Sequence, residues 1–438
     1  MLSSIEFVYI ASYLLKNTNH QVKVLDAQNL NYEDIRKEVQ KIMPDLVGIT
    51  TTSFTLPDAI LTAKIVKSIN DDIHVNLGGP HMQIYPIETV QLPDIDSVVI
   101  GDGEITLAEL ANSIEKKESL KKIRGVMFKE NEKIIYSDMK PINNDLDSLP
   151  FPDRTLLPVK EYSLKISKKK IVTSMIGSRG CPYSCNFCFK STEFRYRSVK
   201  NLVDEIEECI SFGIEDIQFY DETFTFSKIR TREICDEIIK RKLNIDFGIR
   251  TRTDLVDREL MKKLKKAGCV RINYGVESGN PKILKEIGKD SKLERIKEVF
   301  RITKNESIEA IAYFMIGFPN ETKKGILDTI DFAIELDPDY CIFSMLIPYP
   351  GTKLYKDLIK SGFYMEDFWR NFALNPLSNF TPRTCNMYLS REQLLDLLEY
   401  AYKQFYFRPR YIIDRLRKMR SIHEFKNHLK VAYEMLKL

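Results

Sequence analysis

The sequence predicts an α/β protein with a doubly wound, Rossmann-like N-terminal domain, a partial (β/α)6 barrel of the TIM type and a helical C-terminal extension. Short apolar runs alternate with amphipathic stretches over residues 1–140, and the alternation resumes with a different layout over 171–352. From 353 to 438 the pattern is helical. Residues 141–170 contain Leu149-Pro150-Phe151-Pro152, which cannot continue a helix or a central strand, so they are predicted to form a linker.

Composition favours a soluble globular protein over a fibrous or disordered one. The chain has 438 residues, 43% hydrophobic and 29% charged, and a net charge of only +4, so we expect no nucleic-acid partner. No window approaches the roughly 18 apolar residues of a spanning helix, and the N-terminus lacks the pattern of a signal peptide. We therefore expect a cytoplasmic protein.

The first segment predicts a sheet with a ligand crevice at one edge. Its predicted strands are 20–26, 46–51, 74–77 and 97–100, with helices at 32–43 and 56–69 and a hairpin at 123–138. In doubly wound sheets, ligands bind beyond the carboxyl ends of the strands. Glycines there let a backbone approach a bulky ligand closely, and free amides and hydroxyls can hold a phosphate-bearing tail; ordinary turn chemistry is the alternative. The candidate residues are Thr51, Ser53, Gly78, Gly79, Gly101 and Gly103.

The second segment predicts parallel strands at 171–176, 216–220, 245–250, 270–276, 310–316 and 340–347. Helical stretches such as 199–211 and 257–266 separate them. In barrels of this kind the active site lies at the carboxyl ends of the strands. A cluster of cysteines follows the first of these strands.

Cys181, Cys185 and Cys188 form a C-x-x-x-C-x-x-C run in a loop bounded by glycine and proline. Three thiolates at this spacing can wrap one 4Fe-4S cluster and ligate three of its irons. An open position on the fourth iron favours catalysis, because a substrate or cofactor must reach the metal. The other cysteines are scattered singly and are predicted to be buried and inert: Cys209, Cys235, Cys269, Cys341 and Cys385.

This loop resembles the signature of the radical S-adenosylmethionine superfamily, and Phe187 before the last cysteine fits that signature. The resemblance implies that the methionine amino and carboxylate groups of S-adenosylmethionine chelate the fourth iron. One electron, supplied by a low-potential donor such as ferredoxin or flavodoxin, would then break the sulfonium C–S bond. The resulting 5′-deoxyadenosyl radical would abstract hydrogen from substrate, while the protein orients the cofactor and keeps water and oxygen away.

Two later strand ends match the superfamily in the expected order. Asp221 and Glu222 end the second strand, where a carboxylate would face the cofactor's ammonium group. Arg252 ends the third strand and would fork onto the cofactor's carboxylate. A solvated acidic turn is the alternative for Asp221 and Glu222.

The fourth and fifth strands carry further matches. Glu277 lies in a segment that looks like the R-I-x-x-G-x-E-S-G pattern of one branch, and we expect it near the cofactor. A structural ion pair with Arg250 or Arg271 is the alternative. Gly317 ends the fifth strand, where the resemblance implies backbone contact with adenine.

A doubly wound domain ahead of this barrel is similar to the cobalamin-binding class of the superfamily, over about residues 4–420. The resemblance implies that cobalamin lies in the crevice of the first domain and faces the barrel mouth. It also implies a reaction that methylates an unactivated carbon, or closes or rearranges a skeleton, in a small-molecule or lipid substrate. His81 is not assigned as a cobalt ligand, because no D-x-H-x-x-G segment is present.

One departure leaves two alternatives open. The family normally begins with a further strand and a proline-containing loop before the stretch matched by residues 5–14, and a sheet without that strand loses a wall of its crevice. The chain could then be a radical enzyme with a degenerate, non-cobalamin first domain. A non-catalytic cobalamin or iron–sulfur carrier is a separate alternative from the class of binding proteins.

The C-terminal region combines basic and aromatic residues between 403 and 430. Such a helix suits peripheral contact with a membrane surface, and a lipid substrate is one hypothesis that it motivates. A solvated helix that packs its apolar side on the rest of the protein is the alternative.

Overall fold

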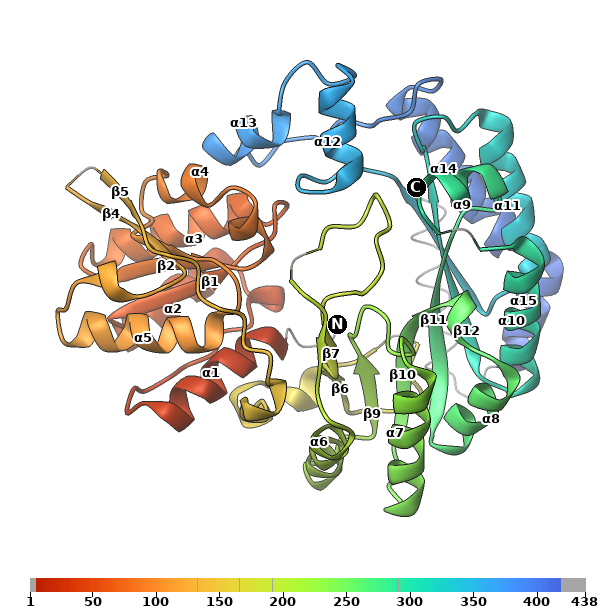
Figure 1. Cartoon of the computed structure of the whole chain (residues 1–438), viewed down its shortest axis with the longest axis horizontal. Helices are drawn as coiled ribbons and strands as arrows, with labels where there is room; N and C mark the ends of the chain where they lie inside the picture. The colour runs from red at the N-terminus through yellow and green to blue at the C-terminus, as the bar shows by residue number, and fades with distance from the viewer. Residues whose placement is uncertain (1–4, 132, 165, 191, 290, 419–438) are drawn as a thin grey trace.

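The computed structural model describes residues 5–131, 133–164, 166–190, 192–289 and 291–418. Two sheets dominate the chain, and the first domain faces the open side of the second (Figure 1). The first sheet has the strand order β1-β2-β3-β4-β5, and the second has the order β13-β12-β11-β10-β9-β6. The α/β fold predicted from the alternating pattern is confirmed.

The first sheet is parallel over three strands and antiparallel over two. Its strands are β1 (Leu46–Thr50), β2 (His74–Gly78), β3 (Ser97–Val99), β4 (Val126–Glu130) and β5 (Lys133–Tyr136). Its helices are α1 (Ile5–Asn17), α2 (Tyr32–Ile42), α3 (Leu56–Ile69), α4 (Pro86–Val90) and α5 (Gly103–Glu115). Apolar side chains such as Val75, Leu77 and Val98 are fully buried between these layers. Parallel strands with buried faces explain why the sequence reads as short continuous apolar runs.

The strand predicted at residues 20–26 was wrong, because these residues pair with no described strand. None of residues 20–26 is buried, so their alternating apolar side chains gain little from joining a sheet. Within the described residues β1 forms this edge of the sheet.

The second sheet is an open half-barrel of parallel strands, as predicted. Its strands are β6 (Val172–Met175), β9 (Asp216–Phe219), β10 (Asp246–Arg252), β11 (Cys269–Glu277), β12 (Glu309–Ile316) and β13 (Tyr340–Met345). The outer helices are α6 (Val199–Ser211), α7 (Lys228–Lys240), α8 (Arg258–Lys266), α10 (Leu293–Asn305) and α11 (Lys323–Leu336). The sheet curls with these helices on its outside (Figure 1). Its carboxyl ends open toward the first domain.

The C-terminal helices cover one edge of the half-barrel and its upper rim. They are α12 (Lys353–Lys360), α13 (Phe368–Leu374), α14 (Arg391–Tyr406) and α15 (Pro409–Lys418). Tyr406 on α14 accepts a hydrogen bond from the Cys341 amide and donates one to its carbonyl, at 3.0 and 2.7 Å. Tyr402 does the same for Phe343 at 3.2 and 2.9 Å. These hydroxyls satisfy the backbone of edge strand β13, which would otherwise invite another strand.

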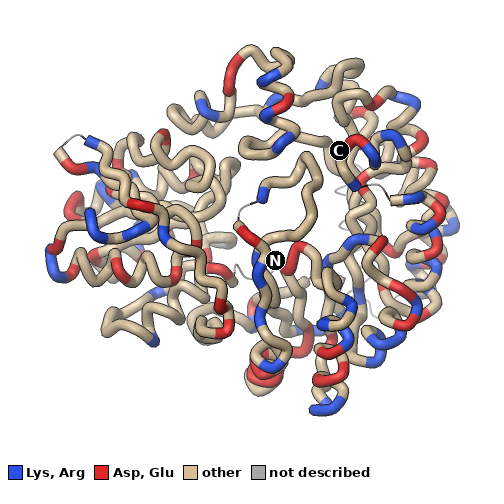
Figure 2. The backbone as a smooth tube through the Cα atoms, in the orientation of Figure 1, with Lys and Arg blue, Asp and Glu red and all other residues tan. Residues whose placement is uncertain are grey.

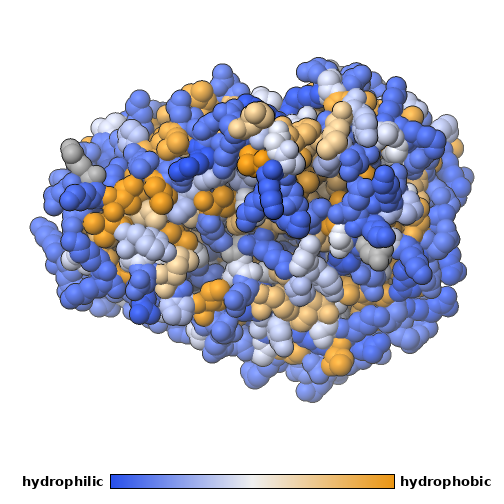
Figure 3. All heavy atoms as spheres, turned by 45° about the horizontal axis from the view of Figure 1, so that its top comes forward, coloured by the Kyte–Doolittle hydropathy of each residue, from blue (hydrophilic) through white to orange (hydrophobic). Residues whose placement is uncertain are grey.

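Positively and negatively charged residues are interspersed along the outer helices (Figure 2). Hydrophobic residues form small groups among hydrophilic ones on the face shown in Figure 3. Within the described residues, no helix is long and apolar enough to cross a membrane.

Candidate active site

The cysteines lie on a loop closed at its base by a two-stranded ribbon. The ribbon consists of β7 (Ser178–Arg179) and β8 (Arg195–Tyr196), paired antiparallel. Gly180 has a φ of +75°, and a Cβ there would lie 2.8 Å from the Thr192 carbonyl oxygen. Only glycine fits this position, so the base of the loop is tightly closed. The loop extends between the two sheets (Figure 1).

The three cluster cysteines differ from the other cysteines in exposure. Cys188 is exposed and Cys181 and Cys185 are partly so, whereas the five remaining cysteines are buried, as predicted. The thiols of Cys185 and Cys188 share a hydrogen bond, which lowers the pKa of Cys185 and raises that of Cys188, while the charges of Lys289 and Arg252 lower the pKa of Cys185 further. Accessible thiols in an electropositive setting suit metal ligation, which requires thiolates.

The described residues contain no group of three or more His, Cys, Asp or Glu side chains arranged to hold a single metal ion. A cubane places each thiolate on a different iron, so its three ligands need not converge on one point. The thiol chemistry, the shared loop and the partial exposure of Cys181, Cys185 and Cys188 fit such a cluster. Phe187 between them is half-buried and packs against the core of the protein.

Asp221 and Glu222, at the end of β9, have different surroundings. Asp221 is fully buried and accepts hydrogen bonds from the Gly177 amide at 2.7 Å and the Ser178 hydroxyl at 2.6 Å. Burial raises the pKa of Asp221, and these hydrogen bonds oppose the shift. Glu222 is exposed and makes no hydrogen bond or ion pair within the described residues. Glu222 therefore has the free carboxylate, while Asp221 holds the entry to the cysteine loop.

Arg252, at the end of β10, lies against the cysteine loop. Its guanidinium makes two 2.9 Å hydrogen bonds to Asp254 and lies 3.7 Å from the Cys185 sulfur. It also stacks over the Tyr183 ring at 4.3 Å. The two carboxylate contacts use the fork geometry of arginine and leave the charge beside a cluster ligand.

Glu277, at the end of β11, pairs with Lys289 and not with Arg250 or Arg271. Lys289 Nζ lies 2.6 Å from Glu277 Oε1 and 2.6 Å from the Gly275 carbonyl oxygen. Glu277 has a φ of +72° at a break in the register between β11 and β12. The anticipated ion pair therefore exists with a different partner, because Arg271 makes two 2.7 Å hydrogen bonds to Asp216.

Gly317, at the end of β12, has a φ of +90° and donates its amide to Glu321 Oε2 at 2.7 Å. Glu321 also accepts the Phe318 amide at 3.2 Å, while its Oε1 is buried without a partner in the described part of the chain. Burial raises the pKa of Glu321 to about 7. A buried carboxyl thus fixes the turn predicted to contact adenine.

The four glycines predicted to line the corrinoid crevice differ in how much space lies beside them. A Cβ on Gly78 or Gly101 would meet nothing within 4 Å, so these backbones face open space. A Cβ on Gly79, where φ is +96°, would lie 2.6 Å from the Thr50 hydroxyl oxygen. A Cβ on Gly103 would lie 3.0 Å from Ile10. Gly78 and Gly101 can therefore admit a bulky ligand, while Gly79 and Gly103 allow close packing.

The hydroxyls of Thr51 and Ser53 are used within the domain. Thr51 contacts Thr55 at 3.1 Å, and Ser53 contacts Nδ1 of His81 at 2.9 Å. His81 is buried and its Nε2 has no partner in the described chain; burial lowers its pKa to about 4. His81 is thus a buried, neutral histidine that holds Ser53 through one ring nitrogen.

A cavity of about 210 Å³ lies beside the end of β3. It is bounded by Gly101, Asp102 and Met139 of the first domain, by Ile142 of the linker, and by Thr192 of the cysteine loop. The cavity lies at the junction of the two domains and includes Gly101, whose backbone faces open space.

Comparison with known proteins identifies both halves. The radical SAM superfamily model matches residues 175–333, and the B12 binding domain model matches residues 2–111. An uncharacterized methyltransferase of Pyrococcus horikoshii is 35% identical over 92% of this chain and 88% of its own length. The anaerobic magnesium-protoporphyrin IX monomethyl ester cyclase of Rubrivivax gelatinosus is 29% identical over 91% of this chain and 72% of its own length.

Solved structures share the fold. OxsB, a cobalamin-dependent S-adenosylmethionine radical enzyme solved with aqua-cobalamin and S-adenosylmethionine, superposes with a TM-score of 0.75 at 20% identity. That match covers 99% of this chain and 69% of OxsB. The methyltransferase TsrM of Kitasatospora setae gives a TM-score of 0.68 at 20% identity, over 82% of this chain and 72% of TsrM.

Fold and site together define a radical enzyme with a corrinoid-type first domain. The chain belongs to the cobalamin-binding class of radical S-adenosylmethionine enzymes, with a 4Fe-4S cluster, S-adenosylmethionine and cobalamin as its cofactors. Sequence reasoning did not identify the roles of Lys289, Glu321, Asp102, Arg179 and Arg195. Only Asp102 had a visible signal, because it begins the Asp-Gly-Glu run after β3.

Proposed function

We propose that this enzyme methylates an unactivated carbon of a small-molecule substrate, with the cluster on Cys181, Cys185 and Cys188. The observation that carries the proposal is a direct contact between the cysteine loop and the first domain. Arg195, at the base of the cysteine loop, lies 2.6 Å from Asp102 at the end of β3. Bound on either side of this contact, the cofactors would supply a substrate radical and a methyl group within one shared space.

The chain's own residues would bind and orient S-adenosylmethionine. Glu222 has the free carboxylate for its ammonium group, and Arg252 has a guanidinium beside Cys185 for its carboxylate. Glu277 and the turn at Gly317, whose amide is held by Glu321, would border the ribose and adenine side of the site. Asp221 would act indirectly, because both its oxygens hold the start of the cysteine loop.

Each segment of the chain would have a separate task in this scheme. Residues 1–140 would hold the corrinoid through the open edge at Gly78 and Gly101, with Thr51, Ser53, Gly79 and Gly103 shaping that edge. Residues 141–170 would link this domain to the S-adenosylmethionine half-barrel at 171–352. The extension from 353 would close the substrate space, and its residues beyond 418 lie outside the described chain.

Relatives support methyl transfer and keep oxidative cyclisation as a second candidate. The 35% identical Pyrococcus protein is named as a methyltransferase, and the 29% identical Rubrivivax protein as a cyclase. Both reactions would begin with hydrogen abstraction from an unactivated carbon. A low-potential ferredoxin or flavodoxin would supply the electron, and the exposure of Cys188 leaves one side of the cluster loop accessible to it.

A peripheral membrane contact is a separate proposal for α15. Ile412, Ile413 and Leu416 on its outer face are 41%, 47% and 48% exposed. An open groove of about 590 Å³ beside it is lined by more cations than carboxylates: Lys297, Arg301, Lys304, Arg408 and Arg410 against Glu335 and Asp337. Apolar residues beside a basic groove suit an anionic bilayer.

Sedimentation with vesicles tests this contact. We expect the full chain to sediment with phosphatidylglycerol vesicles and not with phosphatidylcholine vesicles, and Ile413→Glu to abolish the association. Ile229→Glu is the matched control, since Ile229 is 70% exposed on α7. Equal recovery in the supernatant with both lipids would remove the proposal.

Turnover tests the enzymatic proposal. The cluster-loaded protein, reduced without oxygen and given S-adenosylmethionine, is expected to release 5′-deoxyadenosine, and Cys185→Ala to release none. Removal of cobalamin is expected to abolish methyl transfer. A carrier would retain its cofactors and release no 5′-deoxyadenosine, which would contradict the proposal.

A further inference from the structure

The base of the cysteine loop is held by acidic residues of the other domain. Arg195 Nη1 lies 2.6 Å from Asp102 Oδ2, and Arg179 Nη1 lies 3.3 Å from Asp102 Oδ1. Arg179 also forms an ion pair with Glu104. Arg179 and Arg195 face each other as partners in the β7–β8 ribbon, one on each side of the loop. Asp102 and Glu104 therefore form ion pairs with both strands of the ribbon.

These ion pairs are largely shielded from water. The side chains of Arg195 and Glu104 are 3% and 6% exposed, and those of Arg179 and Asp102 are 16% and 27% exposed. Arg195 also donates to the Asn143 carbonyl at 2.6 Å and to the Thr192 hydroxyl at 2.8 Å. Charge-assisted hydrogen bonds in such surroundings hold their geometry more firmly than exposed pairs do.

Asp102 gives up its ordinary local role for this contact. It occupies the N-cap position of α5, where an aspartate usually accepts a backbone amide of the first turn. Here its side chain makes no capping hydrogen bond, and each of its oxygens meets an arginine of the ribbon. The Asp102 side chain therefore forms an interdomain contact and does not cap α5.

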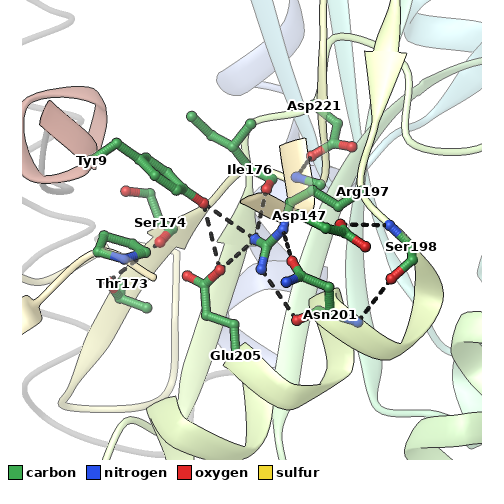
Figure 4. Close-up of polar contacts among 12 residues, drawn as sticks. Tyr9, Asp147, Thr173, Ser174, Ile176, Arg197, Ser198, Asn201, Glu205 and Asp221 are labelled. Atoms are coloured by element: carbon green, nitrogen blue, oxygen red, sulfur yellow. Dashed lines mark hydrogen bonds and ion pairs between the residues drawn. The ribbon is translucent and has the colours of Figure 1, made fainter. Parts of the chain in front are cut away.

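A neighbouring network on α6 anchors the same ribbon. Arg197, two residues after Arg195, forms an ion pair with the fully buried Glu205 and donates to the Tyr9 hydroxyl at 3.2 Å (Figure 4). Arg154 of the linker completes the pairing at 2.5 Å from Glu205. Tyr9 belongs to α1, so a second element of the first domain is tied to the ribbon. Motion of the first domain would be transmitted to the cysteine loop.

The same acidic residues border the space predicted for the corrinoid. Asp102 and Glu104 line the 210 Å³ cavity together with Gly101, whose backbone faces open space, and with Thr192 of the cysteine loop. A ligand that occupies this edge must contact the residues that hold the ribbon. We propose that Asp102, Arg179 and Arg195 are positioning residues that couple corrinoid binding on the first domain to the placement of the iron–sulfur loop.

This inference rests on the proposed location of the corrinoid. Coupling between two binding events is reciprocal, so assembly of the cluster must change cobalamin affinity by the same factor as cobalamin changes cluster affinity. Couplings of this kind are typically about 5–150-fold. Loss of a contact with a merely structural role would change the cobalamin affinity of the cluster-loaded and the cluster-free protein by the same factor. The ratio of these two affinities would then stay unchanged.

The experiment measures that ratio. Hydroxocobalamin is titrated without oxygen into full-length protein with its cluster and into the same protein stripped by a chelator, and binding is followed by absorption. We expect a dissociation constant at least about fivefold lower in the cluster-loaded form. Asp102→Asn and Arg195→Lys are expected to bring the ratio close to one, because the first removes the charge that faces both arginines and the second removes the guanidinium that joins Asp102 to Asn143 and Thr192.

Glu88→Gln is the matched control. Glu88 of α4 pairs with Arg370 at 2.6 Å, which is also an interdomain contact but does not touch the ribbon. It is expected to keep the wild-type ratio. The signal of the reduced cluster in electron paramagnetic resonance should also shift on cobalamin addition in the wild type and in Glu88→Gln, but not in Asp102→Asn.

Two failures are distinguishable. Cobalamin binding of equal affinity with and without the cluster, or an unchanged ratio in both ribbon variants, would overturn the coupling alone. Absence of cobalamin binding in either form would overturn the proposed corrinoid location, and the coupling with it.

Discussion

Lys289 Nζ lies 2.6 Å from Glu277 Oε1, and this pair is buried beside the cysteine loop, with side chains 5% and 11% exposed. Glu277 ends β11 at a positive φ, so its side chain leaves the regular alternation of the strand. The ion pair therefore fixes a strand end that faces the cofactor site. It also places a lysine where no sequence pattern indicated one.

Removing one partner of this pair is expected to destabilise the protein. Lys289→Met leaves the Glu277 carboxylate buried without its counter-ion, which typically costs about 3–5 kcal/mol. The double variant with Glu277→Gln should recover much of this loss, because no unpaired charge remains. Urea unfolding of the two variants and the wild type measures both effects. A free energy of unfolding for Lys289→Met within about 1 kcal/mol of the wild type would speak against the pair.

Gly79 is expected to tolerate no side chain. Gly79→Ala places a Cβ 2.6 Å from the Thr50 hydroxyl oxygen at a φ of +96°, so the ends of β1 and β2 must shift. Gly213→Ala has a similar φ of +78° but meets nothing within 4 Å, so it should cost only about 1–2 kcal/mol. Cobalamin retention should fall in Gly79→Ala and persist in Gly213→Ala. Equal cobalamin retention by both variants would show that the turn at Gly79 is not part of the corrinoid site.

Glu321 predicts a pH dependence of stability. Burial raises its pKa from 4.5 to about 7, so the folded protein binds this proton more tightly than the unfolded chain does. The stabilisation is fully present below about pH 4.5 and is lost as the pH rises through 7, by about 3 kcal/mol in total. Unfolding at pH 5 and pH 7.5 in wild type and Glu321→Gln isolates this contribution, because the other titrating groups are common to both. Parallel pH profiles of the two proteins would refute it.

The tyrosines of α14 should contribute to stability through the edge of the half-barrel. Tyr406→Phe removes hydrogen bonds to both backbone groups of Cys341, and leaving such groups unsatisfied costs about 1–3 kcal/mol. Tyr402→Phe should behave similarly at Phe343. Tyr388→Phe serves as the control, since that side chain is 61% exposed. Thermal unfolding of the three variants measures these losses. An equal loss of stability in Tyr388→Phe would contradict the role given to the two α14 hydroxyls.

Much of the fold was predictable because its signals are local. The strands at β1, β2 and β3 and the helices α3, α6 and α14 appear in the sequence as apolar runs and amphipathic periods with recognisable boundaries. The cysteine loop was equally visible, because all three thiols lie within eight residues. The strand predicted at residues 20–26 was wrong because an alternating apolar pattern does not show whether the residues are buried, and here none of them is.

The contacts that organise the site were not predictable, because they join residues far apart in the chain. Arg195 reaches Asp102 across 93 positions, and Arg154 reaches Glu205 across 51. Charge pairs of this kind have no periodicity, and any of several acidic residues could have served as partner. Glu277 illustrates the limit: its need for a cation was foreseen, but the structure supplies Lys289 in place of Arg250 or Arg271.

Cobalamin content is the measurement that tests the two-cofactor scheme most directly. The full chain is purified without oxygen, its cluster is reconstituted, hydroxocobalamin is added, and the absorption spectrum is recorded after desalting. We predict that corrinoid bands persist at close to one equivalent per chain beside the iron–sulfur absorption. Loss of the corrinoid with the iron–sulfur band intact would contradict the scheme and would leave a radical enzyme whose first domain binds no cobalamin.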